Sequence, residues 1–119
     1  MKLAVPAAMN GDDGPGTNPE QLFALGYAAC FQSALLAFAR GRNLDATQSQ
    51  ITAQVGVGPL DSGGFGLQVS LDLHAPNIPA EQAGELMLRA HERCPYSNAT
   101  RGNITVDLSV EGQPVTQQA

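Results

Sequence analysis

Residues 19 to about 40 constrain the fold most, because they predict one long helix with apolar residues on nearly every face. Asn18 is a suitable N-cap, Pro19 a suitable first helical residue, and Gln21 the third residue of a capping box. Gly41 is typical of a helix end. The apolar residues of this segment are Leu22, Phe23, Leu25, Ala28, Ala29, Phe31, Leu35, Leu36 and Phe38.

A helix that is apolar all round must be buried on all sides. A chain of 119 residues, which is the length of one domain, has little material to cover such a helix alone. We therefore expect residues 1–119 to form a single domain that packs its long helix against a second copy of the chain.

Alternating apolar residues predict strands at residues 51–57 and 65–73. Residues 58–64 are rich in glycine and turn-forming residues, so we expect the two strands to pair as an antiparallel hairpin. A further alternating run, residues 104–110, predicts the last strand.

A second amphipathic helix is expected from Pro79 to near Cys94, because Pro95 disfavours a helical conformation in the residue before it. Residues 112–119 are expected to be a frayed tail. The order helix, strand, strand, helix, strand predicts an α+β fold with an antiparallel sheet and a long buried central helix.

The charge balance of 11 acidic and 6 basic residues, −5 overall, argues against a nucleic-acid surface, which needs clustered lysine and arginine. Residues 22–39 form the most apolar stretch, but Gly26, Tyr27, Gln32 and Ser33 interrupt it, so we expect no membrane span. The first residues hold too short an apolar segment for a signal peptide, and we expect a cytoplasmic protein.

Cys30 and Cys94 are the only cysteines of the chain. They can be two inert core thiols, a structural disulfide, or an attacking and a resolving thiol. Structural disulfides are rare in the cytoplasm, which weakens the second interpretation. Cys94 is expected at a helix C-terminus, where the helix dipole opposes a thiolate, so it suits the resolving role. Cys30 needs an activating group from elsewhere in the fold.

Glu20 is the carboxylate nearest to the start of the long helix, where it can simply favour the helix dipole. It lies ten positions before Cys30, which is about 15 Å of rise on a continuous helix. The two side chains can cooperate only if two such helices run antiparallel across a two-fold axis, so that Glu20 of one subunit serves Cys30 of the other.

His91 and Cys94 have the spacing of a metal-ligand pair on a helix. A zinc site would need His74 and Cys30 to converge with them, so a solvated His91 is the favoured interpretation. Arg101 is expected in a loop with a structural salt bridge. We expect no metal or other cofactor.

Residues 16–31 (GTNPEQLFALGYAACF) and 90–103 (AHERCPYSNATRGN) strongly resemble the organic hydroperoxide resistance (Ohr) family of the Ohr/OsmC superfamily. The resemblance covers nearly the whole chain, and the second motif is specific for Ohr. It implies an intertwined homodimer that acts as a thiol peroxidase on organic hydroperoxides, including lipid-derived ones.

By motif position, the resemblance implies that Cys30 is the peroxidatic thiol, Cys94 the resolving thiol and Glu20 the carboxylate of the active-site network. It also implies a lipoylated protein, or another dithiol, as reductant. An apolar environment of Cys30 would favour alkyl peroxides over hydrogen peroxide.

Members of the resembled family carry an N-terminal hairpin whose arginine pairs with the glutamate. Only 16 residues precede Thr17 here, and none is arginine. We therefore expect an N-terminally shortened member, with Arg101 as the substitute cation that the sequence offers. The alternatives are a catalytically weak or inactive fragment and a redox-responsive binding protein.

Overall fold

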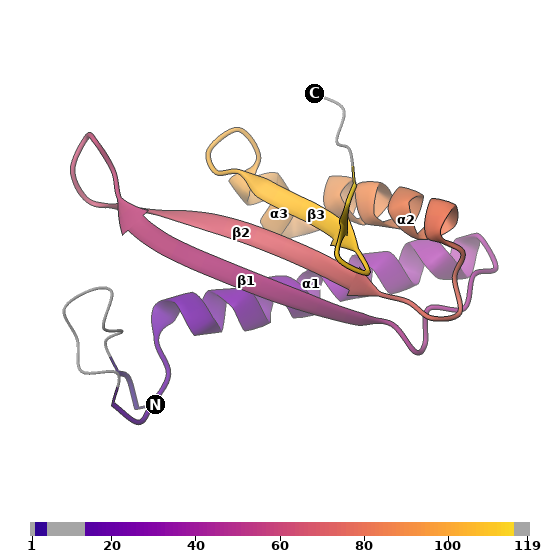
Figure 1. Cartoon of the computed structure of the whole chain (residues 1–119), viewed down its shortest axis with the longest axis horizontal. Coiled ribbons are helices and arrows are strands. Elements are labelled where there is room, and N and C mark those ends of the chain that lie inside the picture. The colour runs from indigo at the N-terminus through magenta and orange to yellow at the C-terminus, as the bar shows by residue number, and fades with distance from the viewer. Residues whose placement is uncertain (1, 5–13, 116–119) are drawn as a thin grey trace.

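A computed structural model describes residues 2–4 and 14–115 of the chain (Figure 1). The elements follow the expected order, with two short additions, so the α+β class is confirmed. They are α1 (Pro19–Gly41), β1 (Gln50–Pro59), β2 (Phe65–His74), α2 (Ala80–Arg93), α3 (Pro95–Thr100), β3 (Val106–Val110) and β4 (Gln113–Pro114).

The start of α1 confirms the predicted cap. The backbone N–H of Gln21 donates to Asn18 Oδ1 at 2.8 Å, which satisfies one of the free donors of the first turn. The side chain of Gln21 accepts from the Thr17 hydroxyl at 2.9 Å. The helix therefore begins at Pro19 as expected and ends at Gly41, one residue later than predicted.

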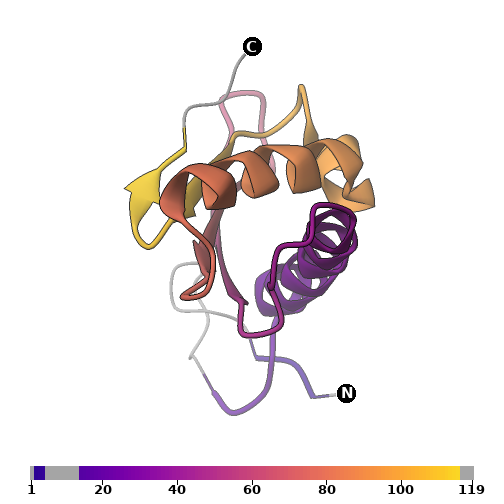
Figure 2. The same cartoon turned by 90° about the vertical axis from the view of Figure 1, so that its right-hand side faces the viewer.

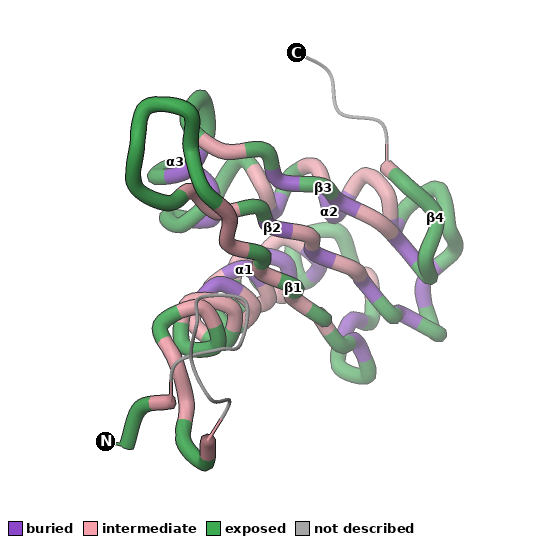
Figure 3. Tube along the Cα trace, turned by 60° about the vertical axis from the view of Figure 1, so that its left-hand side comes forward, coloured by how far each residue is buried: buried purple, intermediate pink, exposed green. Residues whose placement is uncertain are grey.

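Within one chain, α1 is buried along a single stripe. Tyr27, Phe31, Leu35 and Ala39 recur at every fourth position, and none exposes more than 1% of its surface (Figure 3). Leu25, by contrast, is 68% exposed. The single chain thus covers one face of the long helix and leaves apolar surface on another.

By length and hydropathy α1 also passes as a membrane span, with a mean hydropathy of 1.7, so the expectation that no segment is apolar enough is wrong on composition. The core helix of a soluble protein passes the same test. Here the buried stripe packs α1 against β1 and α2, which gives the helix a role in the core.

The four strands lie in the order β1-β2-β3-β4. β1 and β2 form the predicted antiparallel hairpin, with Val55 opposite Val69. The expectation of a wholly antiparallel sheet is wrong, because β3 runs parallel to β2. Helices α2 and α3 lie between these two strands in sequence and return the chain to the same end of the sheet, as parallel neighbours require.

Both long helices lie on the same side of the sheet (Figure 2). Alternation of side chains gives that side the apolar residues and the opposite side polar ones. The inward residues of β2 and β3 include Val69, Leu71, Leu73, Val106, Leu108 and Val110, all of which are buried. Thr52, Gln54, Ser70, Asp72 and Ser109 line the polar side.

The end of the chain departs from prediction. Gln113–Pro114 pairs with β3 as β4, and the backbone N–H of Val115 donates to the carbonyl of Leu108 at 2.8 Å. A frayed tail beginning at residue 112 is therefore wrong for this stretch, and residues 116–119 lie outside the described part of the chain. The turn uses Glu111 and Gly112 at positive φ, a conformation that the strand pattern does not reveal.

Replacing the N-cap tests whether α1 depends on its first turn. Asn18→Ala is expected to lower the free energy of unfolding by about 1 kcal/mol, because the N–H of Gln21 loses its partner. Asn18→Asp, which caps equally well, is the matched control and should change stability by a few tenths. Urea denaturation followed by circular dichroism measures both, and equal losses in the two variants would contradict the capping role.

Candidate functional site

The two cysteines meet although 64 residues separate them in sequence. Cys30 comes from the middle of α1, and Cys94 joins the end of α2 to the start of α3. Both are free thiols, and their sulfur atoms lie 3.3 Å apart. A disulfide bond is about 2.05 Å long, so a shift of little more than 1 Å separates this arrangement from a bonded pair.

The two thiols differ in exposure. Cys94 has no exposed surface, whereas Cys30 is partly exposed at the edge of the buried stripe of α1. The Cys94 S–H donates toward the sulfur of Cys30. A small molecule from solvent therefore reaches Cys30 before Cys94.

Burial raises the pKa of the Cys94 thiol, and its hydrogen bond to Cys30 raises it further. The backbone N–H groups of Ser97 and Tyr96 face the sulfur and act in the opposite direction, because they stabilise a thiolate. Burial is the largest of these effects. Cys94 thus keeps its proton at neutral pH, and burial, not the dipole of α2 that the sequence predicts, is the largest effect that raises its pKa.

Three aromatic rings pack against one another where α1 meets α3, the helix that follows Cys94. Phe23 stacks on Tyr96 with 6.0 Å between ring centroids, and it meets the edge of Tyr27 at 5.7 Å. Tyr96 also lies over Gly26, where a Cβ would come within 3.0 Å of its hydroxyl. The missing side chain of Gly26 therefore lets Tyr96 lie against α1, one turn before Cys30.

A buried polar network lies behind Cys94. The Ser97 hydroxyl shares a hydrogen bond of 2.7 Å with the Tyr27 hydroxyl and one of 2.8 Å with His91 Nδ1. The Thr100 hydroxyl lies 3.4 Å from that of Tyr27 and donates to the carbonyl of Ser97 at 3.2 Å. This network joins α1, α2 and α3 through one fully buried serine.

His91 is thus half-buried and hydrogen-bonded, and the expectation of a solvated histidine is wrong. Burial lowers its pKa, and the nearby charge of Arg101 lowers it further, while Glu92 acts in the opposite direction. His91 is therefore neutral at neutral pH. A neutral ring nitrogen can either accept from the Ser97 hydroxyl or donate to it, depending on the tautomer.

Arg101 holds the end of α2 to α3. Its guanidinium donates to the His91 carbonyl and to Asn98 Oδ1, both at 2.6 Å. The predicted salt bridge is replaced by these two bonds to neutral groups. These bonds tie up the guanidinium of Arg101 within the single chain, and its role as a substitute cation stays a prediction.

Glu20 does not join the thiols within one chain, because it lies in the first turn of α1. One of its carboxylate oxygens, Oε2, is nevertheless buried and has no hydrogen-bond partner among residues 2–4 and 14–115. A buried carboxylate oxygen without a donor is costly, so this atom needs a donor from outside the described residues.

The comparison with known families gives a clear result. A family model described as OsmC-like protein matches residues 11–109. An organic hydroperoxide resistance protein of Xanthomonas axonopodis pv. citri (strain 306) is 46% identical over 110 residues, which are 92% of this chain and 77% of that protein. The chain belongs to the Ohr/OsmC family.

Solved structures of organic hydroperoxide resistance proteins have a similar fold to this chain. An organic hydroperoxide resistance protein from Vibrio cholerae O1 biovar eltor str. N16961, with captopril bound in one of its active sites, is 50% identical with a TM-score of 0.86. The match covers 94% of this chain and 76% of that one. The OhrB protein of Bacillus subtilis is 48% identical with a TM-score of 0.76, over 82% of this chain and 73% of that one.

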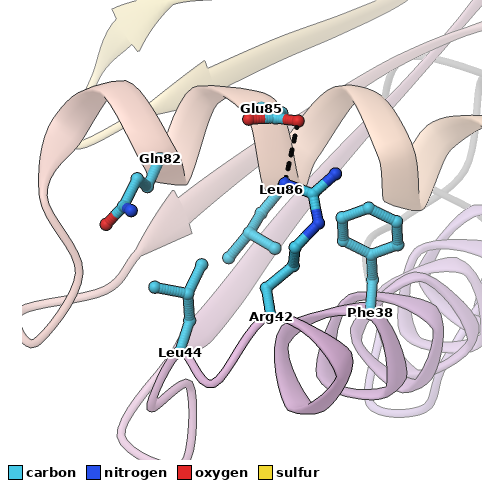
Figure 4. A pocket seen from close by; sticks show the side chains of 6 residues that line it. All are labelled: Phe38, Arg42, Leu44, Gln82, Glu85 and Leu86. Carbon is cyan, nitrogen blue, oxygen red and sulfur yellow. Dashed lines mark ion pairs between the residues drawn. The ribbon is translucent and has the colours of Figure 1, made fainter.

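A small pocket lies between the C-terminal end of α1 and α2, but it is not part of the thiol site of this Ohr/OsmC chain. Arg42 crosses it and pairs with Glu85 at 3.2 Å (Figure 4). Arg42 also lies over the Phe38 ring, and Phe38 is eight residues, or about 12 Å of helix, beyond Cys30. The described residues hold no cluster of three metal-ligating side chains.

The sequence predictions did not include Tyr27, Tyr96 or Ser97 among the residues near the cysteines, although the sequence holds a signal for Tyr27 and one for α3, which carries the other two. Tyr27 lies three residues before Cys30, so both belong to one side of the helix. Pro95 is typical of the first position of a helix as well as of the end of one, which predicts α3 and makes Cys94 its cap.

The raised pKa of Cys94 has a measurable consequence. In a Cys30→Ser variant only Cys94 reports, and its alkylation by iodoacetamide is expected to be slow at pH 7 with a midpoint above about 8.5, the ordinary value for cysteine. The same variant unfolded in urea is the control and should react with an ordinary profile. Rapid alkylation of the folded protein at pH 7 would contradict the burial argument.

Proposed function

We propose that this Ohr/OsmC-family chain is a thiol peroxidase that reduces organic hydroperoxides to alcohols, with Cys30 as the attacking thiol and Cys94 as the resolving thiol. The relatives named for organic hydroperoxide resistance support this class of substrate. The observation that carries the proposal is the 3.3 Å contact between one partly exposed and one buried sulfur.

In the first step the Cys30 thiolate attacks the terminal oxygen of the hydroperoxide. The O–O bond breaks, Cys30 becomes a sulfenic acid, and the alkoxide takes a proton and leaves as the alcohol. In the second step the sulfur of Cys94 displaces the hydroxyl from Cys30, and the proton of Cys94 leaves with that hydroxyl as water. A dithiol then reduces the disulfide by exchange.

The division of roles follows from exposure and protonation. Cys30 is the thiol that a peroxide can reach, because Cys94 has no exposed surface. The raised pKa of Cys94 keeps it as a thiol until a sulfenic acid forms next to it. Because the S–H of Cys94 already points at Cys30, the second step needs little movement.

The aromatic rings on α1 and α3, the helices that flank the two thiols, support an organic rather than a small polar peroxide. Phe23 and Tyr96 form a stacked pair of side chains that are only partly buried and so remain available to a ligand. Removing an alkyl tail from water against such a surface is favourable by about 25 cal/mol per Å². The hydroxyl of hydrogen peroxide gains nothing comparable.

We further propose that the protein works as an intertwined homodimer. The uncovered side of α1 exposes Leu22 and Leu25, and Phe65 at the sheet end is 59% exposed. A second copy that covers this surface would supply the missing donor to Glu20 Oε2 and bring that glutamate toward a Cys30 of the other subunit. The reductant is a lipoylated protein or another dithiol, and we expect the reaction to take place in the cytoplasm.

Replacing each cysteine by serine is expected to affect peroxide consumption differently. Cys30→Ser should abolish consumption of an alkyl hydroperoxide, because the attacking atom is lost. Cys94→Ser should allow one turnover and leave Cys30 as a sulfenic acid, 16 mass units heavier, as one added oxygen requires. Mass spectrometry with peroxide assays measures both, and repeated turnover by Cys30→Ser would show that the assignment is wrong.

Assembly is tested at the exposed side of α1. The unmodified protein is expected to sediment as a dimer at micromolar concentration, and Leu25→Glu should shift it toward monomer, since a charge would be buried without a partner. Gln54→Glu adds the same charge on the polar side of the sheet and is the control. A monomeric unmodified protein with a cooperative melt would contradict the dimer.

A further inference from the structure

We infer that His91 is a positioning residue for the disulfide-forming step: acting through Ser97, it holds the turn whose backbone N–H groups face the sulfur of Cys94. This inference rests on the proposed function, and it assigns a task to a side chain that the mechanism above does not use. It concerns the second step alone, in which Cys94 attacks the sulfenic acid of Cys30.

The geometry places Ser97 between two fixed anchors. His91 lies three residues before Cys94 on α2, and Ser97 lies three residues after it on α3. Their 2.8 Å hydrogen bond therefore closes a loop around Cys94. Tyr27 holds the same serine hydroxyl from α1 at 2.7 Å, and the hydroxyl is buried from solvent.

The turn so fixed carries the N–H groups of Tyr96 and Ser97, which face the sulfur of Cys94. In the second step the Cys94 S–H bond and the Cys30 S–O bond break, the S–S bond forms, and the hydrogen and hydroxyl leave as water. Negative charge develops on the Cys94 sulfur as its proton departs. Donors that already point at this sulfur stabilise that charge without rearrangement.

His91 is held at its backbone and at its ring. Arg101 donates to its carbonyl at 2.6 Å and so ties its backbone to α3. The ring is held by its bond to Ser97, and His91 lines a surface pocket together with Arg101, Gly102 and Asp107. The charged groups near the ring are thus Arg101, Asp107 and Glu92, and no change in their charge is needed for the effect.

The first step uses no group of this turn directly. Cys30 is on α1, and it is the partly exposed thiol of the pair. Loss of the His91–Ser97 bond should therefore slow formation of the disulfide while sulfenic acid still forms at its ordinary rate. A residue that only stabilised the fold would affect both steps or neither.

The test mixes reduced full-length protein with one equivalent of an alkyl hydroperoxide and follows both products by quenching and mass spectrometry. Sulfenic acid is trapped with dimedone, and the disulfide is detected by the loss of two hydrogens. His91→Asn keeps an amide near the position of Nδ1, and His91→Gln places the same amide near that of Nε2. Glu92→Gln, at the exposed neighbour, is the control.

We expect His91→Ala and His91→Gln to slow disulfide formation about tenfold, the size of effect expected for one lost hydrogen bond between neutral groups, with sulfenic acid formation unchanged. His91→Asn should restore the rate to within about threefold of the unmodified protein. The Asn and Gln variants decide the question even where His91→Ala does not fold.

Equal rates for the Asn and Gln variants, equal slowing of both steps, or an unchanged rate of disulfide formation would each overturn the inference. If the unmodified protein forms no sulfenic acid with an alkyl hydroperoxide, the proposed function fails, and the role of His91 fails with it. A normal first step with a normal second step in His91→Gln removes the role of His91 alone and leaves the proposed function standing.

Discussion

Burial of one stripe of α1 against β1 and α2 decides where the functional side chains of this Ohr/OsmC protein lie. The helix turns by about 100° per residue, so Cys30 is about 100° around from the buried Phe31 and about 60° from the buried Tyr27. Cys30 is therefore held at the edge of the core, near enough to touch Cys94 and partly open to solvent. A rotation of α1 by one residue would bury it or point it away.

Cys94 owes its position to the break between two helices. Pro95 ends α2 and begins α3, so that Cys94 is both the C-cap of α2 and the N-cap of α3. That geometry buries the sulfur and also turns two backbone N–H groups toward it. Burial keeps the proton on the thiol, and the N–H groups favour a thiolate, so one turn supplies both properties that the proposed resolving role requires.

The sequence predicts the parts of this protein that depend on local patterns. The N-cap at Asn18, the hairpin of β1 and β2 and the end of α2 at Cys94 each follow from residues close together in the chain. The parallel pairing of β2 with β3 and the bond of His91 to Ser97 depend on how distant segments pack, which periodicity does not encode. The meeting of Cys30 with Cys94 was available from family resemblance, but not from spacing alone.

The long helix was expected to be buried all round, and the single chain buries only one stripe of it. Leu25 on the uncovered side is an exposed apolar side chain, and Glu20 Oε2 in the first turn is a buried oxygen without a donor among the described residues. An apolar side chain needs surface to cover it, and a buried carboxylate oxygen needs a donor. Water can donate to a carboxylate but cannot cover an apolar side chain, so the homodimer proposed above is the arrangement that would meet both needs.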